Sequence, residues 1–336
     1  MKDVINFQAF DTPVTKQQIH DTQNTKPGVI SKRAWLVVVI FLAIFFGVLR
    51  AWALEASAAD WLITFLANFS VAAAVGLFIW WIGVVLSDKA TERRIRLGHF
   101  ASDNNLTYIS ETAKPAYPGI IFSSGSQRQL YDRFRAEGFE IGNYRYTVQH
   151  GKSSTTYKYG YICINLERHV AHMLLDAKSN NTKIFGLNIS NLPLTINKDQ
   201  TLALEGDFND HFTLYAPKEY ERDALYIFTP DLMALLIDQV AQFDVEVIDN
   251  QLFVYGKEFN FTERKVWQRI ADIITKVGQK TITQTDYYAD ERVGDRSQDS
   301  IAEPGKRLRK GLSWYVIIFA VLWVLSYVLQ IILAHR

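Results

Sequence analysis

Three long apolar segments constrain this chain more than any other feature. The first runs from Ala34 to about Leu54 with no charged residue before Arg50, and the other two, Trp61 to Leu86 and Leu312 to Ala334, contain none. Each exceeds the roughly 17 residues that a helix needs to cross about 30 Å of hydrocarbon. A helix of a soluble core rarely stays apolar on every face for that length. The pattern predicts two transmembrane helices near the amino terminus and one near the carboxyl terminus.

Basic residues near the ends of these segments predict the orientation, because lysine and arginine are retained on the cytoplasmic side. They precede the first segment (Lys32, Arg33), follow the second (Arg93, Arg94, Arg96) and precede the third (Arg307, Arg309, Lys310), whereas the connection 55–60 has two acids and no base. We therefore expect a multi-pass protein of the cytoplasmic (inner) membrane. Its amino terminus and main domain should be cytoplasmic, and its carboxyl terminus should lie outside. The polar residues before the first segment do not resemble a cleaved signal, so that segment should stay as an anchor.

The chain accordingly divides into six regions. They are a flexible cytoplasmic tail at 1–33, a transmembrane hairpin at 34–87, a juxtamembrane helix at 88–105, a cytoplasmic domain at 106–289, a charged linker at 290–311 and a transmembrane helix at 312–336. The single cysteine, Cys163, excludes an intramolecular disulfide framework and suits a reducing compartment.

Periodicity in the middle region predicts an α+β domain on an antiparallel sheet. A helix is expected from Ser126 to Gly138, with capping-box spacing at Ser126 and Gln129 and with Leu130 and Phe134 on one face. Further helices should begin near Pro217, at Pro230 after the cap Thr229, and near Thr262, the last ending at Gly278. Expected strands are 139–148 paired as a hairpin with 155–166, then 173–177 and 212–215, and a second hairpin of 245–248 with 252–255 turning at Asp249 and Asn250. Strands that come as hairpins, with helices between or after them, indicate an antiparallel sheet.

Three groups of side chains are candidates for chemistry. The first is His169 and His172 near Glu167 and Asp176; the second is Glu205, Asp207, Asp210 and His211; the third is a tyrosine-rich hairpin of Tyr144, Tyr146, Tyr157, Tyr159 and Tyr161 beside Arg145, Lys152 and Lys158. The first two groups contain the residue types that a metal site or acid–base chemistry needs. In a strand, however, the two histidines of the first group would point to opposite faces. In the second group, acids beside glycine and asparagine more often close turns. Aromatic and basic residues on a sheet face bind single-stranded nucleic acid in some proteins. In others an amphipathic strand of this kind contacts a membrane surface or a peptide, and most often such residues stabilise a half-exposed sheet through cross-strand pairs.

Composition and missing motifs narrow the alternatives. A net charge of +1 gives no basic face for nucleic acid, so we expect no nucleic-acid partner. The sequence contains no phosphate-binding loop of the GxxxxGK type, no GxSxG, no HExxH and no CxxC. We therefore assign no catalytic, cofactor-binding or metal-ligating residue and expect no cofactor. Small residues along the second segment (Ser70, Ala72, Ala74, Gly76, Gly83) favour close helix contact, possible between two copies of the chain.

One stretch resembles a known family. The segment 205–216, followed by 221–236, is similar to the bacterial membrane-protein family called domain of unknown function 3137. The positions that match are Phe208, Phe212, Tyr215, Ala224, Thr229, Pro230, Met233 and Leu236. The resemblance implies a bacterial membrane protein and supplies no activity or site residue. We expect a membrane protein that acts by binding, as an adaptor or sensor with the lipid bilayer and a protein as its partners. The alternative is a membrane-tethered, hydrolase-like enzyme, metal-dependent or not, that uses Asp207, Asp210 and His211.

Overall fold

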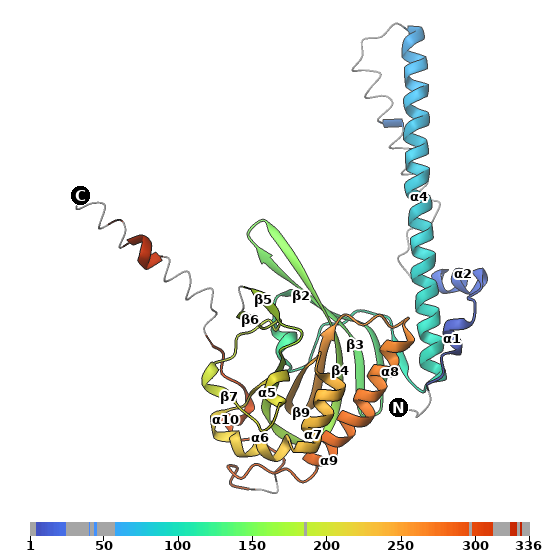
Figure 1. The fold of residues 1–336 in the computed structure, drawn as a ribbon. Helices are drawn as coiled ribbons and strands as arrows, with labels where there is room; N and C mark the ends of the chain where they lie inside the picture. Colours follow the sequence, from blue (N-terminus) through green and yellow to red (C-terminus); the bar gives the residue numbers. More distant parts are fainter. Residues whose placement is uncertain are drawn as a thin grey trace. The chain divides into compact units, whose positions relative to one another are not determined.

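The computed structural model describes residues 5–24, 40, 44–45, 58–184, 187–295, 298–311, 323–327 and 330. The chain forms two compact units, one of Asn6–Phe100 and the other of Ala101–Arg336 with Met1–Ile5. Figure 1 shows the elements of both units.

The first unit is helical. It contains α1 (Gln8–Asp11), α2 (Lys16–Asn24) and most of α4 (Ala58–Asp103). The rings of Phe7 and Phe10 stack on Phe100 with centroids 5.9 and 4.8 Å apart, and the Arg96 guanidinium donates to the Phe10 carbonyl at 2.7 Å. The prediction of a flexible tail is therefore wrong for 5–24, because two aromatic side chains find an apolar partner on α4. Residues 1–4 and 25–33 of the predicted tail lie outside the described part.

The predicted membrane segments are described only in part. Helix α4 includes the second segment and continues through 88–103, where a juxtamembrane helix was expected. The first and third segments lie, apart from residues 40, 44–45, 323–327 and 330, outside the described residues. In the described part of the chain, no helix is both long enough and apolar enough to cross a membrane.

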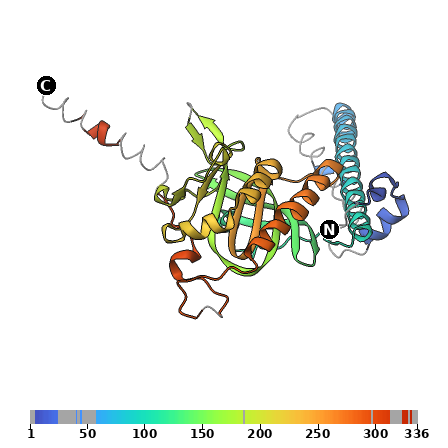
Figure 2. The same ribbon diagram turned by 60° about the horizontal axis from the view of Figure 1, so that its bottom comes forward.

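The second unit is an α+β domain, as predicted, on an antiparallel sheet. Seven strands form the sheet: β1 (Thr107–Ile109), β2 (Ser126–Ala136), β3 (Phe139–His150), β4 (Ser153–Ala177), β7 (Thr201–Leu202), β8 (Phe212–Tyr215) and β9 (Asp244–Lys257). Their order is β1-β2-β3-β4-β8-β7, with β9 also paired to β4. Strands β5 (Thr182–Ile184) and β6 (Leu187–Ile189) form a separate pair. Figure 2 shows that the main sheet is strongly curved.

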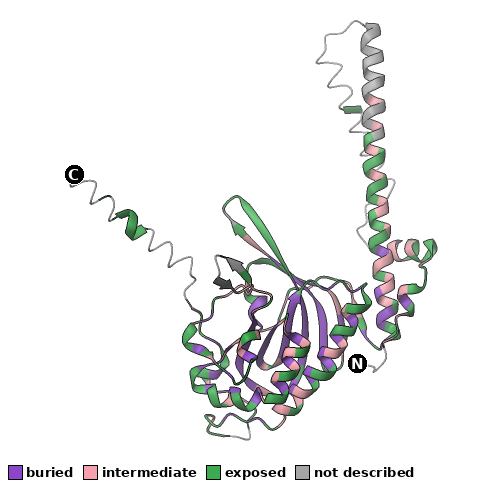
Figure 3. Cartoon of the chain, in the orientation of Figure 1, coloured by how far each residue is buried: buried purple, intermediate pink, exposed green. Residues whose placement is uncertain are grey.

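Strand β4 organises the sheet. Its 25 residues pair with β3 over 153–164, with β9 over 159–175 and with β8 over 174–177. The strands predicted at 155–166 and 173–177 are thus one strand, and their separation was wrong. The β3–β4 hairpin itself is confirmed, and its tip at 151–158 is exposed (Figure 3).

Different elements pack on the two faces of the sheet. Helices α7 (Pro230–Val240), α8 (Arg264–Asp272), a π-helical turn (Ile273–Gly278) and α9 (Gln279–Thr285) lie on one face, where Trp267 contacts Phe134 with ring centroids 4.7 Å apart. The other face carries an aromatic core around Phe122 of the 3-10 turn η1 (Ile120–Ser123). The rings of Phe122 and Tyr144 are 4.9 Å apart there. The helix expected near Pro217 is present as a 3-10 turn, η3 (Lys218–Tyr220), followed by α6 (Glu221–Ile227). Helix α7 begins at Pro230, as expected.

The helix predicted at 126–138 is wrong, because these residues form β2. Leu130 and Phe134, four residues apart, fit a helix face, but Leu130 pairs with Tyr144 and Phe134 pairs with Ile141. A bulge at Asp132, which has φ 47°, inserts one residue between them and turns the two side chains to opposite faces. Gly138, with φ 81°, forms the turn to β3 and not a helix end.

The hairpin predicted at 245–255 is also wrong, since β9 is continuous through Asp249 and Asn250. Asp249 has the left-handed φ of 54° that a turn would use, but here it marks an irregularity in the pairing with β4. The long strand β4 offers a partner along the whole length of β9, and this pairing replaces the local turn. The helix predicted to end at Gly278 also continues past that residue. Gly278 has no side chain, and this leaves room for Ile164, because a Cβ atom at Gly278 would lie 2.6 Å from Cδ1 of Ile164.

The charged segment 290–311 was predicted to be a linker, but it is packed on the domain as a C-terminal strap (residues 290–295 and 298–311). Ile301 and Leu308 are buried, and Gly305 lies against the Tyr220 ring. The strap includes α10 (Glu303–Lys306) and ends in a β-bridge between Lys310 and Ile196. Periodicity missed it because its contacts are single apolar side chains and backbone groups, not a repeating face.

Candidate functional site

The acidic group of the sequence lies on an exposed turn. Asp207 precedes the one-turn helix α5 (Phe208–His211), and the Asp210 amide donates to the Asp207 carbonyl at 2.9 Å. Asp207 and Asp210 are exposed, and His211 is half-buried at the end of the turn. Throughout the described residues, no group of three or more His, Cys, Asp or Glu side chains is arranged to hold a metal ion. The geometry is that of a chain reversal.

The two histidines of β4 have separate partners. The Nδ1 atom of the partly exposed His169 lies 2.9 Å from Oδ2 of Asp299, whereas His172 is buried and its Nε2 lies 2.7 Å from Oε1 of Glu246. The two rings do not share a ligand position.

The tyrosine hairpin forms part of the core. Tyr144, Tyr146, Tyr159 and Tyr161 are buried, and Tyr157 is 41% exposed. Burial raises the pKa of the Tyr161 hydroxyl well above its usual range, and its hydrogen bond to Glu140 at 2.6 Å raises the pKa further. Because four of the five rings face inward, the hairpin offers no row of stacked, accessible rings.

A buried polar network joins four segments on the aromatic face. Glu246 accepts hydrogen bonds from the Tyr255 hydroxyl at 2.7 Å and from the Ile120 amide at 2.9 Å, besides its contact with His172. The Leu308 amide donates to Nδ1 of His172 at 3.0 Å, so Nε2 carries the proton and donates to Glu246. Both oxygens of Glu246 are thus used by protein donors, and the network holds the fold and the strap together.

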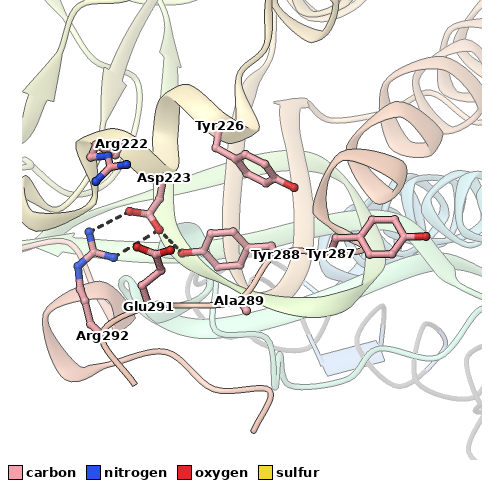
Figure 4. A pocket seen from close by; sticks show the side chains of 8 residues that line it. All are labelled: Arg222, Asp223, Tyr226, Tyr287, Tyr288, Ala289, Glu291 and Arg292. Carbon is pink, nitrogen blue, oxygen red and sulfur yellow. Dashed lines mark hydrogen bonds and ion pairs between the residues drawn. The ribbon is translucent and has the colours of Figure 1, made fainter. Parts of the chain in front are cut away.

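A surface hollow of about 450 Å³ lies between α6 and the start of the strap (Figure 4). Its lining consists of Arg222, Asp223, Tyr226, Tyr287, Tyr288, Ala289, Glu291 and Arg292. The sequence does not predict this hollow, because Tyr287 and Tyr288 lie at the end of the predicted domain and Arg292 lies in the predicted linker. The available signal was an aromatic pair directly after a predicted helix.

Ion pairs and hydrogen bonds join the residues at the floor of the hollow. The Arg292 guanidinium lies 3.0 Å from Oδ2 of Asp223, 3.2 Å from Oδ1 of Asp290 and 3.9 Å from the centre of the Tyr220 ring. The Tyr288 hydroxyl donates to Oδ1 of Asp223 at 2.7 Å. Burial, followed by this contact with Asp223, raises the pKa of Tyr288 above its usual range. Figure 4 shows Asp223 between Arg292 and Tyr288.

The rim of the hollow is open to solvent. Tyr287 is 89% exposed and Tyr226 is 45% exposed, and the neighbouring Leu225 on α6 is 53% exposed. In the described part of the domain, the other large apolar side chain with such exposure is Tyr157. The exposed Arg222 has no hydrogen-bond or ion-pair partner within the described residues. Exposed tyrosines beside an available arginine are the residue types that dominate protein-binding surfaces.

Comparisons with known proteins assign no family. No described protein family and no curated protein matches the sequence. Among solved structures, the chain is similar to the crystal structure of the mycobacterial trehalose monomycolate transport factor A, TtfA. The TM-score is 0.36 at 12% sequence identity, over 58% of this chain and 91% of that one. A likeness at this TM-score assigns neither a shared fold nor a function.

Proposed function

We propose that this chain is a membrane-anchored binding protein, an adaptor or sensor, whose α+β domain holds a protein partner at the hollow. The observation that carries this proposal is the exposed pair Tyr226 and Tyr287 above a floor of ion pairs. The Tyr226 ring lies beside the Tyr288 ring, with centroids 6.3 Å apart, and this contact lowers the cost of ordering Tyr226 on binding. Arg222 favours a partner segment that carries a carboxylate next to an apolar or aromatic side chain.

The membrane part of the proposal is supported by the sequence and by one feature of α4. Between residues 75 and 86, six apolar residues of α4 have exposed fractions of 49–61%: Val75, Leu77, Phe78, Ile79, Trp81 and Leu86. Exposed apolar area of this kind is stable in hydrocarbon or against another apolar surface. We include in the proposal three membrane helices at 34–54, 61–86 and 312–334, a location in a bacterial inner membrane with the domain on the cytoplasmic side, and self-association through the small residues of the second helix. Membership of the uncharacterised family named above is part of the same proposal.

The enzyme alternative has less support. Asp207, Asp210 and His211 lie on one exposed turn, and His172 is occupied by Glu246 and the strap. A catalytic site would need such groups to converge in a partly buried pocket. We therefore retain binding as the proposed function.

Site-specific photocrosslinking tests the proposal. A photoreactive phenylalanine in place of Tyr287, in the full chain in its native membrane, should give a discrete adduct, and Arg222→Glu should reduce the yield of that adduct at least about tenfold by removing the charge complement. The matched control is the same amino acid at Tyr157, which is also exposed, and it should give no such adduct. Equal adducts from both positions, or an adduct that persists unchanged with Arg222→Glu, would contradict binding at the hollow.

A further inference from the structure

The β3–β4 hairpin extends beyond its neighbouring strands as a two-stranded arm (residues 148–158). Pairing of β3 with β2 ends at Thr147, and pairing of β4 with β9 begins at Tyr159, so in the described part of the chain the arm pairs only with itself. Its β4 half, 153–158, spans about 20 Å at roughly 3.3 Å per residue. Figure 1 shows the arm standing clear of the other strands. A two-stranded hairpin alone is marginally stable in water, so we expect the arm to contact a further surface.

The two faces of the arm differ in polarity. Val148 pairs with Thr155, and Tyr146 at the base pairs with Tyr157, so these side chains share one face. Val148 is partly buried against the aromatic core, whereas Thr155 is exposed and Tyr157 is 41% exposed. The other face carries Gln149, Ser154, Thr156 and Lys158. The arm is therefore amphipathic.

The loop after β6 continues the apolar face of the arm. At the base of the arm, the Tyr159 hydroxyl donates to the Asn191 carbonyl at 2.9 Å. The next three residues are partly exposed, and both leucines among them pack on the same aromatic core as Val148. The arm and the loop together form an apolar patch: Val148, Tyr157, Leu192, Pro193 and Leu194.

The end of the strap holds this loop next to the predicted third membrane segment. Lys310 forms a β-bridge with Ile196, and the Gly311 amide donates to the Thr195 carbonyl at 2.8 Å. The predicted segment begins at the next residue, Leu312. One residue spans at most about 3.6 Å, and the headgroup layer on each side of a bilayer is roughly 6 Å thick. If the segment spans the membrane, the loop beside Thr195 therefore lies at the membrane surface.

Lysines with available charge lie on the arm and beside the loop. Lys152 is at the tip of the arm, and Lys198 and Lys310 lie beside Ile196. All three are exposed, and within the described residues none of their ammonium groups has a hydrogen-bond or ion-pair partner. From residue 141 to 166 the chain contains no Asp or Glu. Tyrosine and lysine at the edge of an apolar surface are typical of membrane interfaces, where the ammonium groups meet anionic headgroups.

We propose that the apolar patch lies in the headgroup layer of the membrane that the chain spans, with Lys152, Lys198 and Lys310 against anionic lipid phosphates. This inference rests on the membrane part of the proposed function. The patch buries its exposed apolar surface in the lipid, while Thr156 on the opposite face of the arm stays in water. The contact holds one face of the α+β domain against the lipid. The hollow shares none of these residues.

Spin labels test the contact in the full chain, reconstituted as single copies in lipid nanodiscs that contain phosphatidylglycerol, with Cys163 replaced by serine. A label at Thr155 should collide with a water-soluble nickel complex at least about threefold more slowly than a label at Thr156, the matched control on the opposite face. Replacing both Lys152 and Lys198 by glutamate should abolish this difference, because the headgroups then repel the arm. Both lysines are exposed, so the variant should stay folded. A slow rate at Thr155 that persists in this variant would show contact with the chain itself and would overturn the proposal.

A label at Ser326, within the predicted third segment, tests the membrane part of the proposed function separately. It should be accessible to oxygen and inaccessible to the nickel complex, as in hydrocarbon. If Ser326 behaves in this way but Thr155 and Thr156 collide with nickel equally fast, the arm does not contact the lipid, and the membrane-spanning proposal stands. If nickel reaches Ser326 freely, the segment does not span the membrane, and both proposals are wrong.

Discussion

Glu246 is the residue at which distant segments of the α+β domain meet. It takes hydrogen bonds from Tyr255 on its own strand, from His172 on β4 and from the Ile120 amide of η1. Through His172 it also orients the acceptor for the Leu308 amide of the strap. A fully satisfied buried network of this kind specifies one arrangement of the core, and a partly satisfied one costs free energy.

Glu246→Ala should therefore destabilise the protein strongly. The substitution leaves the His172 Nε2–H, the Tyr255 hydroxyl and the Ile120 amide buried without an acceptor, and each such group costs about 1–3 kcal/mol. We expect the free energy of unfolding in urea to fall by at least about 3 kcal/mol. The control is Glu258→Ala, which removes the exposed contacts of the Glu258 carboxylate with Tyr131 and Lys158. This substitution should lower the free energy of unfolding by less than about 1 kcal/mol. A loss below 1 kcal/mol for Glu246→Ala would contradict the role of the network.

Residues of this kind are the hardest to predict from sequence. Glu246 stands between Val245 and Val247 in a strand whose polar positions usually face water. Nothing in its neighbours reveals that His172 lies opposite, because the partner is set by the register of β4 and β9. Tyr287 and Arg292 were missed for the same reason: the hollow exists only once the strap folds back on α6.

At the scale of elements, local sequence patterns predict the bounds correctly where the residues of one strand or helix are enough to define its ends. β8 has the predicted bounds of 212–215, and α7 begins at Pro230 as expected. They failed at β2 and β9, where residues with positive φ (Asp132, Asp249) make irregularities within long strands. A left-handed aspartate fits a turn and a bulge equally well, and the partner strand decides between them: β3 for Asp132 and β4 for Asp249.

The strap depends on Asp290, which gives it a predicted pH dependence. Burial opposes the charge of Asp290, but hydrogen bonds from the Ala302 amide, the Tyr220 hydroxyl and Arg292 outweigh it and lower the pKa of this carboxyl. A carboxyl with a lowered folded pKa stabilises the folded state above its unfolded pKa of about 4, and this stabilisation is lost as the pH falls through the folded pKa.

We expect proteolysis within 290–311 to stay slow at neutral pH and to accelerate below about pH 4, as the strap is released. Asp290→Asn should loosen the strap already at pH 7 and remove this part of the acid sensitivity. The exposed Asp295 allows a matched control, Asp295→Asn, that should behave as wild type. If Asp290→Asn and wild type show the same cleavage rate across this pH range, Asp290 does not hold the strap.

For the whole molecule, composition and periodicity were sufficient for the class of fold. Hairpin strands with interspersed helices predict an α+β domain, and the structure has one. The strap could not be placed in the same way, because its apolar residues Ile301 and Leu308 are isolated in a charged segment and find their partners only in the folded domain. The prediction of membrane segments, in contrast, depends on length and hydropathy alone, and neither property requires a tertiary partner.

The proposed function places the α+β domain on the cytoplasmic side of a membrane that the chain spans. Thiol labelling in intact bacterial cells tests it most directly, with Cys163, which is buried, replaced by serine. A cysteine at Ala58, in the predicted outer connection, should react with a membrane-impermeant maleimide, and one at the exposed Ser154 should react only after the membrane is permeabilised. Labelling of Ser154→Cys from outside in intact cells would contradict the account.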